Sequence, residues 1–111
     1  MKRRKEIKQY EIVLVNIDPT LDNEMEKTRP CVVISPNEMN KYLQTIVIAP
    51  LTNKSKPYPT RVEVKQTKTN GWVVLDQIRT IDKIRIVNKL SKLTVNEIIS
   101  IKAVIKETYV E

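Results

Sequence analysis

Arg29-Pro30-Cys31-Val32-Val33-Ile34-Ser35-Pro36 sets four consecutive apolar residues between two prolines. A short apolar run rich in β-branched residues, with chain breakers at both ends, is typical of a buried strand. Pro30 also restricts the residue before it, so the backbone at Arg29 is expected to be extended. We therefore predict a strand over 31–34, with Arg29 at the point where a polar loop enters it.

Further apolar runs predict more short strands on both sides of this one. Residues 12–17 are apolar on both faces of an extended chain, which predicts a central strand. Residues 61–65 alternate apolar and charged side chains, which is typical of a half-buried strand. Strands are also predicted at 46–49, 72–75 and 84–87, and a short irregular or helical segment at 37–42.

The C-terminal segment changes to a helical period. Thr94 and Glu97 have the spacing of a capping box, in which each side chain bonds the backbone of the other residue. The apolar residues that follow at helical spacing are Val95, Ile98, Ile101 and Ile105. The sequence therefore predicts a mainly β (α+β) fold, a small curled antiparallel sheet or barrel of five or six strands with an amphipathic helix over 94–108.

Length and composition favour one domain. The 111 residues leave no room for two, and we assign the domain to residues 10–111. Residues 1–9 are charged without an apolar period, which predicts a flexible basic arm. No apolar segment follows the basic start as in a signal peptide, and none approaches the roughly 20 residues of a membrane-spanning helix. We expect a cytoplasmic protein without a membrane partner.

Charge points to a polyanionic partner. The formal net charge is +7, and the isoelectric point is about 9.6. Such an excess on a small domain makes nucleic acid the first candidate. Charge alone leaves open the alternative that this is simply a basic globular protein.

Missing residue types exclude several chemistries. The chain has no His, one Cys and one Gly. Serine–histidine, cysteine–histidine and histidine-based ribonuclease catalysis therefore lack their bases, and a zinc site or a glycine-rich phosphate loop lacks its residues. We expect no metal or cofactor, and a buried, inert Cys31. Any catalytic acid or base must come from Arg, Lys, Asp, Glu, Tyr or Thr.

Three motifs, in order, resemble the MazF/PemK/Kid toxin family. They are Asp18-Pro19-Thr20 with Arg29-Pro30, then Ile48-Ala49-Pro50-Leu51-Thr52, then Val74-Leu75-Asp76-Gln77-Ile78-Arg79-Thr80. With the closing helix, the resemblance covers residues 10–108. The chain departs from the family pattern in residues 21–28, which contain no glycine where the family loop usually carries some.

The resemblance implies an SH3-like barrel of the Kid/CcdB type, a homodimer, and the toxin of a type II toxin–antitoxin system. It implies cleavage of single-stranded RNA that leaves 2′,3′-cyclic phosphate and 5′-hydroxyl ends. It also implies an antitoxin that blocks the site with an acidic, partly disordered segment. By position, Arg29 and Thr52 match the family's catalytic pair, and Glu24, Asp76 and Gln77 match positions associated with activity or RNA contact.

These residue types suit RNA cleavage by the neighbouring 2′-hydroxyl. The planar fork of Arg29 can hold two phosphate oxygens, and Thr52 adds one hydroxyl donor. A guanidinium titrates above about pH 12, so Glu24 is the candidate for the base. We expect Tyr58 to stack on a base and basic residues around it to contact phosphates. The candidate RNA-binding residues are Asp18, Thr20, Lys54, Lys56, Tyr58, Arg61, Asp76, Gln77 and Arg79.

Each candidate also has an ordinary structural interpretation. Arg29 could pair with a loop carboxylate, Thr52 could close its own turn, and Glu24 could be plain solvated surface. Asp76-Gln77 could end a strand with local hydrogen bonds. Only the joint pattern favours a site. Two other functions stay open, a non-catalytic CcdB-like toxin that binds DNA gyrase and a plain SH3-like RNA-binding module.

Overall fold

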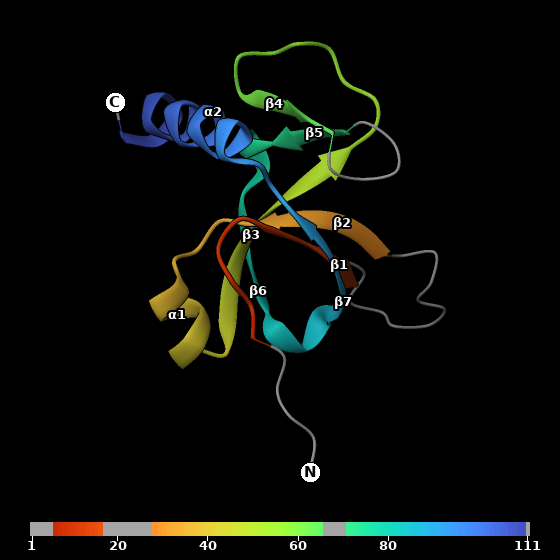
Figure 1. Cartoon of the computed structure of the whole chain (residues 1–111), viewed down its shortest axis with the longest axis vertical. Coiled ribbons are helices and arrows are strands. Elements are labelled where there is room, and N and C mark those ends of the chain that lie inside the picture. The colour runs from red at the N-terminus through yellow and green to blue at the C-terminus, as the bar shows by residue number, and fades with distance from the viewer. Residues whose placement is uncertain (1–5, 17–27, 66–70, 111) are drawn as a thin grey trace.

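The computed structural model describes residues 6–16, 28–65 and 71–110 (Figure 1). The strands are β1 (Glu11–Asn16), β2 (Thr28–Val33), β3 (Thr45–Thr52), β4 (Arg61–Val64), β5 (Gly71–Val74), β6 (Arg79–Asp82) and β7 (Ile86–Lys92). The α-helices are α1 (Asn37–Tyr42) and α2 (Val95–Ile105). Single 3₁₀ turns span Leu75–Gln77 and Lys83–Arg85, and a π turn spans Lys106–Val110.

β3 is the strand that joins the two parts of the sheet. The strand order is β4-β5-β3-β2-β1-β7, and β6 also pairs with β3. β3 pairs with β6 through residues 45–48, with β2 through 48–50 and with β5 through 51–52, always antiparallel. One long strand with three partners curls the sheet, as Figure 1 shows. This confirms the predicted mainly β class, with seven strands among the described residues rather than five or six.

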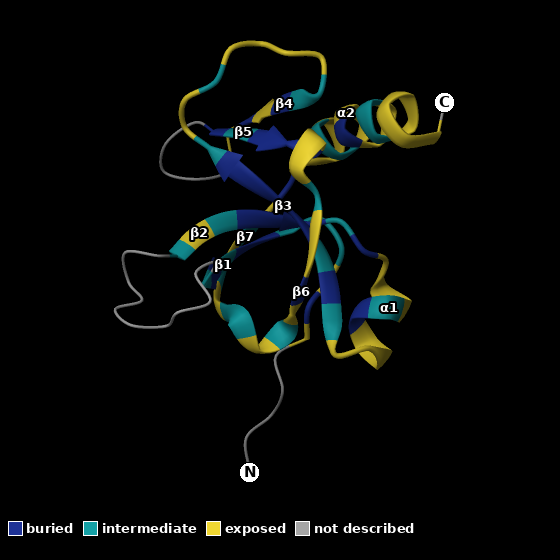
Figure 2. Cartoon of the chain, turned by 180° about the vertical axis from the view of Figure 1, so that it is seen from behind, coloured by how far each residue is buried: buried dark blue, intermediate teal, exposed yellow. Residues whose placement is uncertain are grey.

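Strands β1, β2 and β3 bury side chains on both faces of the sheet. On one face, Ile12, Val32 and Leu51 pack with Ile101 of α2 in one hydrophobic cluster. On the other face, alternating residues of the same strands form a second cluster, and these are Val13, Val15, Cys31, Val33, Ile46 and Ile48. Figure 2 shows the buried colour running along β2 and β3. The prediction that residues 12–17 form a central strand is confirmed as far as Asn16, where the described part ends.

Helix α2 begins with the predicted capping box. The Thr94 hydroxyl accepts from the Glu97 amide at 3.2 Å, and Glu97 Oε1 accepts from the Thr94 amide at 3.0 Å. Glu97 Oε2 accepts from the Lys65 amide at 3.0 Å, which ties the start of α2 to the end of β4. The α-helix ends at Ile105, earlier than predicted, and the chain continues into the π turn.

Residues 6–9 do not form the flexible arm that the sequence predicted. Ile7 is only 8% exposed and packs in the second hydrophobic cluster. The Gln9 side chain donates to the Ile34 carbonyl at 2.7 Å, and the Gln9 amide donates to Asn37 Oδ1 at 2.8 Å. One apolar residue among charges has no period, so the sequence pattern did not reveal this anchor. Residues 1–5 of the expected arm lie outside the described residues.

The strand predicted over 84–87 is also wrong in its boundaries. The Asp82 carboxylate accepts from the Ile84 amide at 2.9 Å and caps a 3₁₀ turn over Lys83–Arg85. β7 therefore begins at Ile86, and residues 79–82, where the sequence predicted no strand, form β6 against β3.

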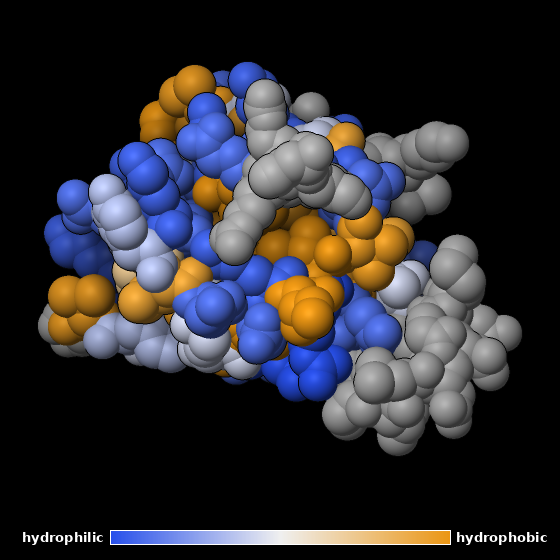
Figure 3. All heavy atoms as spheres, turned by 90° about the horizontal axis from the view of Figure 1, so that it is seen from below, coloured by the Kyte–Doolittle hydropathy of each residue, from blue (hydrophilic) through white to orange (hydrophobic). Residues whose placement is uncertain are grey.

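On the side viewed in Figure 3, hydrophilic side chains surround a hydrophobic area near the middle of the view. Within the described ranges, no helix is long and apolar enough to cross a membrane.

The packing of α2 on the sheet can be tested with two isoleucines of the same helix. Ile101 is fully buried, whereas Ile99 is 58% exposed. We expect Ile101→Ala to lower the free energy of unfolding by about 2–5 kcal/mol, because it leaves a cavity in the core. The same truncation at Ile99 should change it by no more than about 0.5 kcal/mol. Urea denaturation measures both, and equal losses would contradict the described packing.

Candidate functional site

A cavity of about 560 Å³ opens beside the end of β3. Its lining comprises Arg29, Pro50, Leu51, Thr52, Lys54, Arg61, Val74, Gln77 and Arg79. Six of these nine were predicted as site residues from the sequence, and they come from β2, β3, β4, β6, the 3₁₀ turn after β5 and the loop after β3. Among the described residues, the lining holds four cationic side chains and no carboxylate. Such a concave cluster of one sign attracts a polyanion.

The sheet register brings Arg29 and Thr52 together. Cys31 of β2 pairs with Pro50 of β3 in an antiparallel ladder. Continuing that register by two residues places Arg29 level with Thr52, and both line the cavity. Arg79 reaches the same place from β6, where it pairs with Ile48. Three strands thus place two arginines and one hydroxyl around one space.

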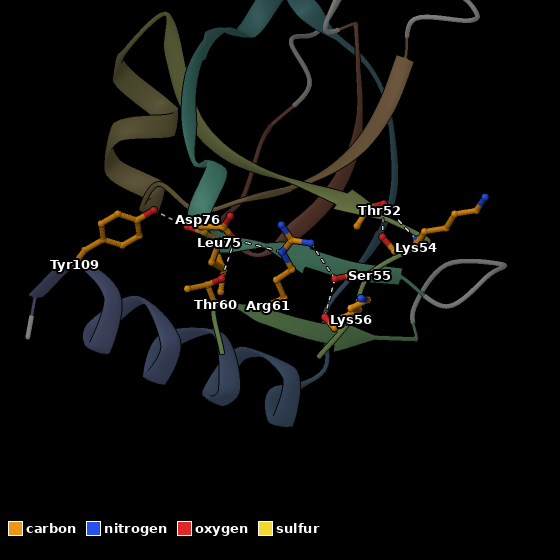
Figure 4. Close-up of polar contacts among 9 residues, drawn as sticks. All are labelled: Thr52, Lys54, Ser55, Lys56, Thr60, Arg61, Leu75, Asp76 and Tyr109. Carbon is orange, nitrogen blue, oxygen red and sulfur yellow. Dashed lines mark hydrogen bonds and ion pairs between the residues drawn. The ribbon is translucent and has the colours of Figure 1, made fainter. Parts of the chain in front are cut away.

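The Thr52 hydroxyl also closes its own turn. It accepts from the Lys54 amide at 3.3 Å and donates to the Lys54 carbonyl at 3.2 Å (Figure 4). The turn interpretation from the sequence is therefore correct, but it does not exclude a role in the site. A hydroxyl has one rotatable donor, so it can turn to a bound oxyanion and still accept from the Lys54 amide.

Arg61 is held in the cavity wall by several neighbours. Its Nε lies 3.4 Å from Asp76 Oδ1, its Nη1 donates to Ser55 Oγ at 2.9 Å, and its guanidinium carbon lies 4.9 Å from the centre of the Tyr58 ring. Asp76 Oδ1 also accepts from the Thr60 hydroxyl at 2.9 Å. Figure 4 shows this network between the loop before β4 and the turn after β5.

The hydrogen bonds to Asp76 stabilise its charged form. Partial burial alone would raise the pKa of this carboxyl, but the bonds from Arg61 and Thr60 outweigh burial and hold the pKa below its ordinary value. These two bonds are not the local ones that the sequence suggested, because they connect Asp76 to residues 15 and 16 positions earlier in the chain.

The other predicted site residues lie elsewhere. Lys56, Tyr58 and Asp76 do not line the cavity, although Tyr58 is 49% exposed beside Arg61. Asp18, Thr20 and Glu24 lie outside the described residues.

Three polar residues near the site had no signal in the sequence. Ser55 and Thr60 bind the Arg61–Asp76 pair, as described above. Tyr109 donates from its hydroxyl to the Leu75 carbonyl at 2.6 Å, which ties the end of the C-terminal helix to the turn that carries Asp76 and Gln77. These bonds join segments far apart in the chain, so no local motif reveals them.

Cys31 lies near enough to Arg29 and Arg79 for their charges to act on its thiol. It is fully buried, as predicted. Burial raises the pKa of its thiol to about 12, although the charges of Arg29 and Arg79 act in the opposite direction.

A sequence model described as the PemK-like, MazF-like toxin of type II toxin–antitoxin systems matches residues 8–109. The chain belongs to this toxin family. One relative, the endoribonuclease MazF of Staphylococcus epidermidis, is 33% identical over 102 residues, which cover 86% of this chain and 84% of that protein.

Solved structures share the toxin fold. MazF from Deinococcus radiodurans superposes with a TM-score of 0.80 at 21% identity, covering 97% of this chain and 100% of that one. An endoribonuclease from a mycobacterial species gives a TM-score of 0.78 at 18% identity, covering 96% and 93%. These similarities confirm the fold expected from the sequence motifs.

The raised pKa of Cys31 has a direct chemical consequence. Only the thiolate reacts with alkylating reagents, and a thiol with a pKa of about 12 stays protonated at pH 8. We expect Cys31 to resist iodoacetamide at pH 8 in the folded protein and to react at once in urea. Mass spectrometry counts the label, and rapid labelling of the folded protein would contradict the buried position.

Proposed function

We propose that this member of the toxin family is a metal-independent, sequence-selective endoribonuclease that cuts single-stranded RNA in the cytoplasm. The observation that carries the proposal is the shared cavity. Arg29 and Thr52 line it together with three more cationic side chains, those of Lys54, Arg61 and Arg79. The similarity to an endoribonuclease over most of both chains supports it.

The lining residues suit the charge that develops during cleavage. The 2′-hydroxyl loses its proton and its oxygen attacks phosphorus. The bond to the 5′-oxygen breaks while that oxygen takes up a proton, and the products are a 2′,3′-cyclic phosphate and a 5′-hydroxyl. Arg29 can donate two parallel bonds to the non-bridging oxygens, and Thr52 can add a third. Lys54, Arg61 and Arg79 would neutralise the phosphates on either side.

The proton acceptor for the 2′-hydroxyl must be an anion or a neutral base. Arg29 does not qualify, because its guanidinium remains charged. Asp76 is bound to Arg61 and Thr60 and lies outside the lining. We assign the role to Glu24, which lies five residues before Arg29 in the sequence.

Two other functions fit the fold as well as RNA cleavage does, but they fit the cavity less well. A gyrase-binding toxin of the CcdB kind needs no pair of phosphate donors. A plain RNA-binding module would bind RNA without producing new ends. The juxtaposition of Arg29 and Thr52 in one cationic cavity favours cleavage over both.

The proposal includes two protein partners. One solved mycobacterial endoribonuclease is in complex with its cognate antitoxin, and MazF from Deinococcus radiodurans crystallised with MazE. A cationic cavity without carboxylates among its described lining residues suits an acidic, partly disordered antitoxin segment. We also propose a homodimer, for which the mass in solution at micromolar concentration is the test.

Cleavage centred on Arg29 can be tested on a long single-stranded RNA in excess EDTA, with the 5′ ends mapped by primer extension. We expect discrete cuts by the wild type and a loss of several orders of magnitude for Arg29→Ala, because the main phosphate donor is gone. Lys102→Ala removes one charge from the exposed face of α2 and should cut normally. A folded, fully active Arg29→Ala protein would sink the proposal.

The assignment of Glu24 as the base can be tested by removing its carboxylate. Glu24→Gln should cleave much more slowly than the wild type at every pH, because an amide does not accept the 2′-proton. Single-turnover rates from pH 5 to pH 9 measure this. Normal rates over the whole range would show that another group is the base.

A further inference from the structure

Asp76 and Arg61 differ in their access to the cavity. Arg61 belongs to the lining, whereas Asp76 does not. The Arg61 side chain is 19% exposed and that of Asp76 is 36% exposed, so both can be reached by water but only one faces the proposed RNA site. Asp76 therefore lies next to the site and is connected to it by its bond to Arg61.

Arg61 is unusually restrained for a surface arginine. Asp76 holds Nε, Ser55 holds Nη1, and the Tyr58 ring covers one face of the guanidinium. An arginine has five N–H donors. The contacts to described residues use two of them, which leaves three for a phosphate oxygen. The side chain is thus ordered before any ligand arrives, so RNA need not order it on binding.

Asp76 is poorly suited to contact the phosphates of RNA. An ionised carboxylate only accepts hydrogen bonds, as phosphate oxygens also do, so the two repel. Oδ1 is already shared by Arg61 and Thr60. Its lowered pKa also makes it a weak proton acceptor.

We propose that Asp76 is a positioning residue, which acts on RNA only by holding Arg61 as a preformed phosphate contact in the cavity wall. This rests on the proposed function and refines it. The family resemblance associates Asp76 with activity or RNA contact, and the geometry assigns that effect to Arg61.

The proposal and simple electrostatics predict opposite changes in RNA affinity when the Asp76 charge is removed. Removing a negative charge beside a cationic cavity should strengthen the binding of a polyanion. If Asp76 positions Arg61, its removal weakens binding instead. Glu63→Gln is the matched control, because Glu63 is an exposed carboxylate two residues from Arg61 on β4.

A double-mutant cycle separates positioning from direct contact. The probe is a short single-stranded RNA with every 2′-hydroxyl methylated, which binds but cannot be cut, and fluorescence anisotropy gives its Kd. We expect Asp76→Asn to weaken binding about three- to tenfold, from the cost of ordering one long side chain. Arg61→Gln should also weaken binding and reduce the salt slope of log K by about 0.7. In the Arg61→Gln background, Asp76→Asn should weaken binding no further.

Two results of the binding experiment would overturn the inference. One is unchanged or tighter binding by Asp76→Asn, as expected for Glu63→Gln. The other is an equal loss in both Arg61 backgrounds, which would show that Asp76 contacts RNA independently. Should Asp76→Asn unfold, as circular dichroism would show, Ser55→Ala removes the other anchor of Arg61 and must give the same coupling.

Cleavage assays on the same variants distinguish this inference from the proposed function. Asp76→Asn should raise KM and leave kcat nearly unchanged, and Asp76→Glu should restore part of the affinity. A lower kcat at unchanged KM would overturn the positioning role in favour of proton transfer. If the wild type binds RNA and shows the predicted coupling but makes no cuts, the proposed function fails and the positioning of Arg61 stands.

Discussion

The site depends on the double burial of β3 and its neighbours. A strand that buries side chains on both faces and pairs along both edges has almost no freedom to shift its register, since a one-residue slip would exchange its two faces. In this protein such a slip would move the residues of each hydrophobic cluster to the face of the other cluster. The end of β3, where Thr52 lies, is therefore fixed in space relative to Arg29 on β2 and Arg79 on β6.

Four cations around one cavity have a cost in the absence of a ligand, because like charges repel more strongly where water is partly excluded. Only Arg61 has an ion pair with a carboxylate among the lining cations of the described part. The remaining repulsion is relieved when a polyanion enters, so the same arrangement favours RNA or an acidic protein segment. Function and stability are opposed here, and the two hydrophobic clusters supply the stability that the site lacks.

The sequence predicted those parts of the molecule that have a local signature. The strands with apolar runs, the capping box at Thr94 and the family motifs around Arg29 and Thr52 all depend on neighbouring residues. The sequence did not predict β6 or the anchoring of Ile7, because one depends on pairing with β3 and the other is a single apolar residue among charges. No local pattern in the sequence shows that Asp76, a candidate for RNA contact, lies outside the cavity lining and is hydrogen-bonded to Arg61.

The polar contacts around the cavity have an effect on geometry that exceeds their effect on stability. The loop before β4 and the turn after β5 have little regular structure, and side-chain hydrogen bonds such as Arg61 to Ser55 and Tyr109 to Leu75 hold them in place. Each such bond contributes only about 0.5–1.5 kcal/mol to folding. Phosphate donors, however, must be placed to within a fraction of an ångström to bind well. Mutations in this network should therefore alter RNA binding well before they threaten the fold.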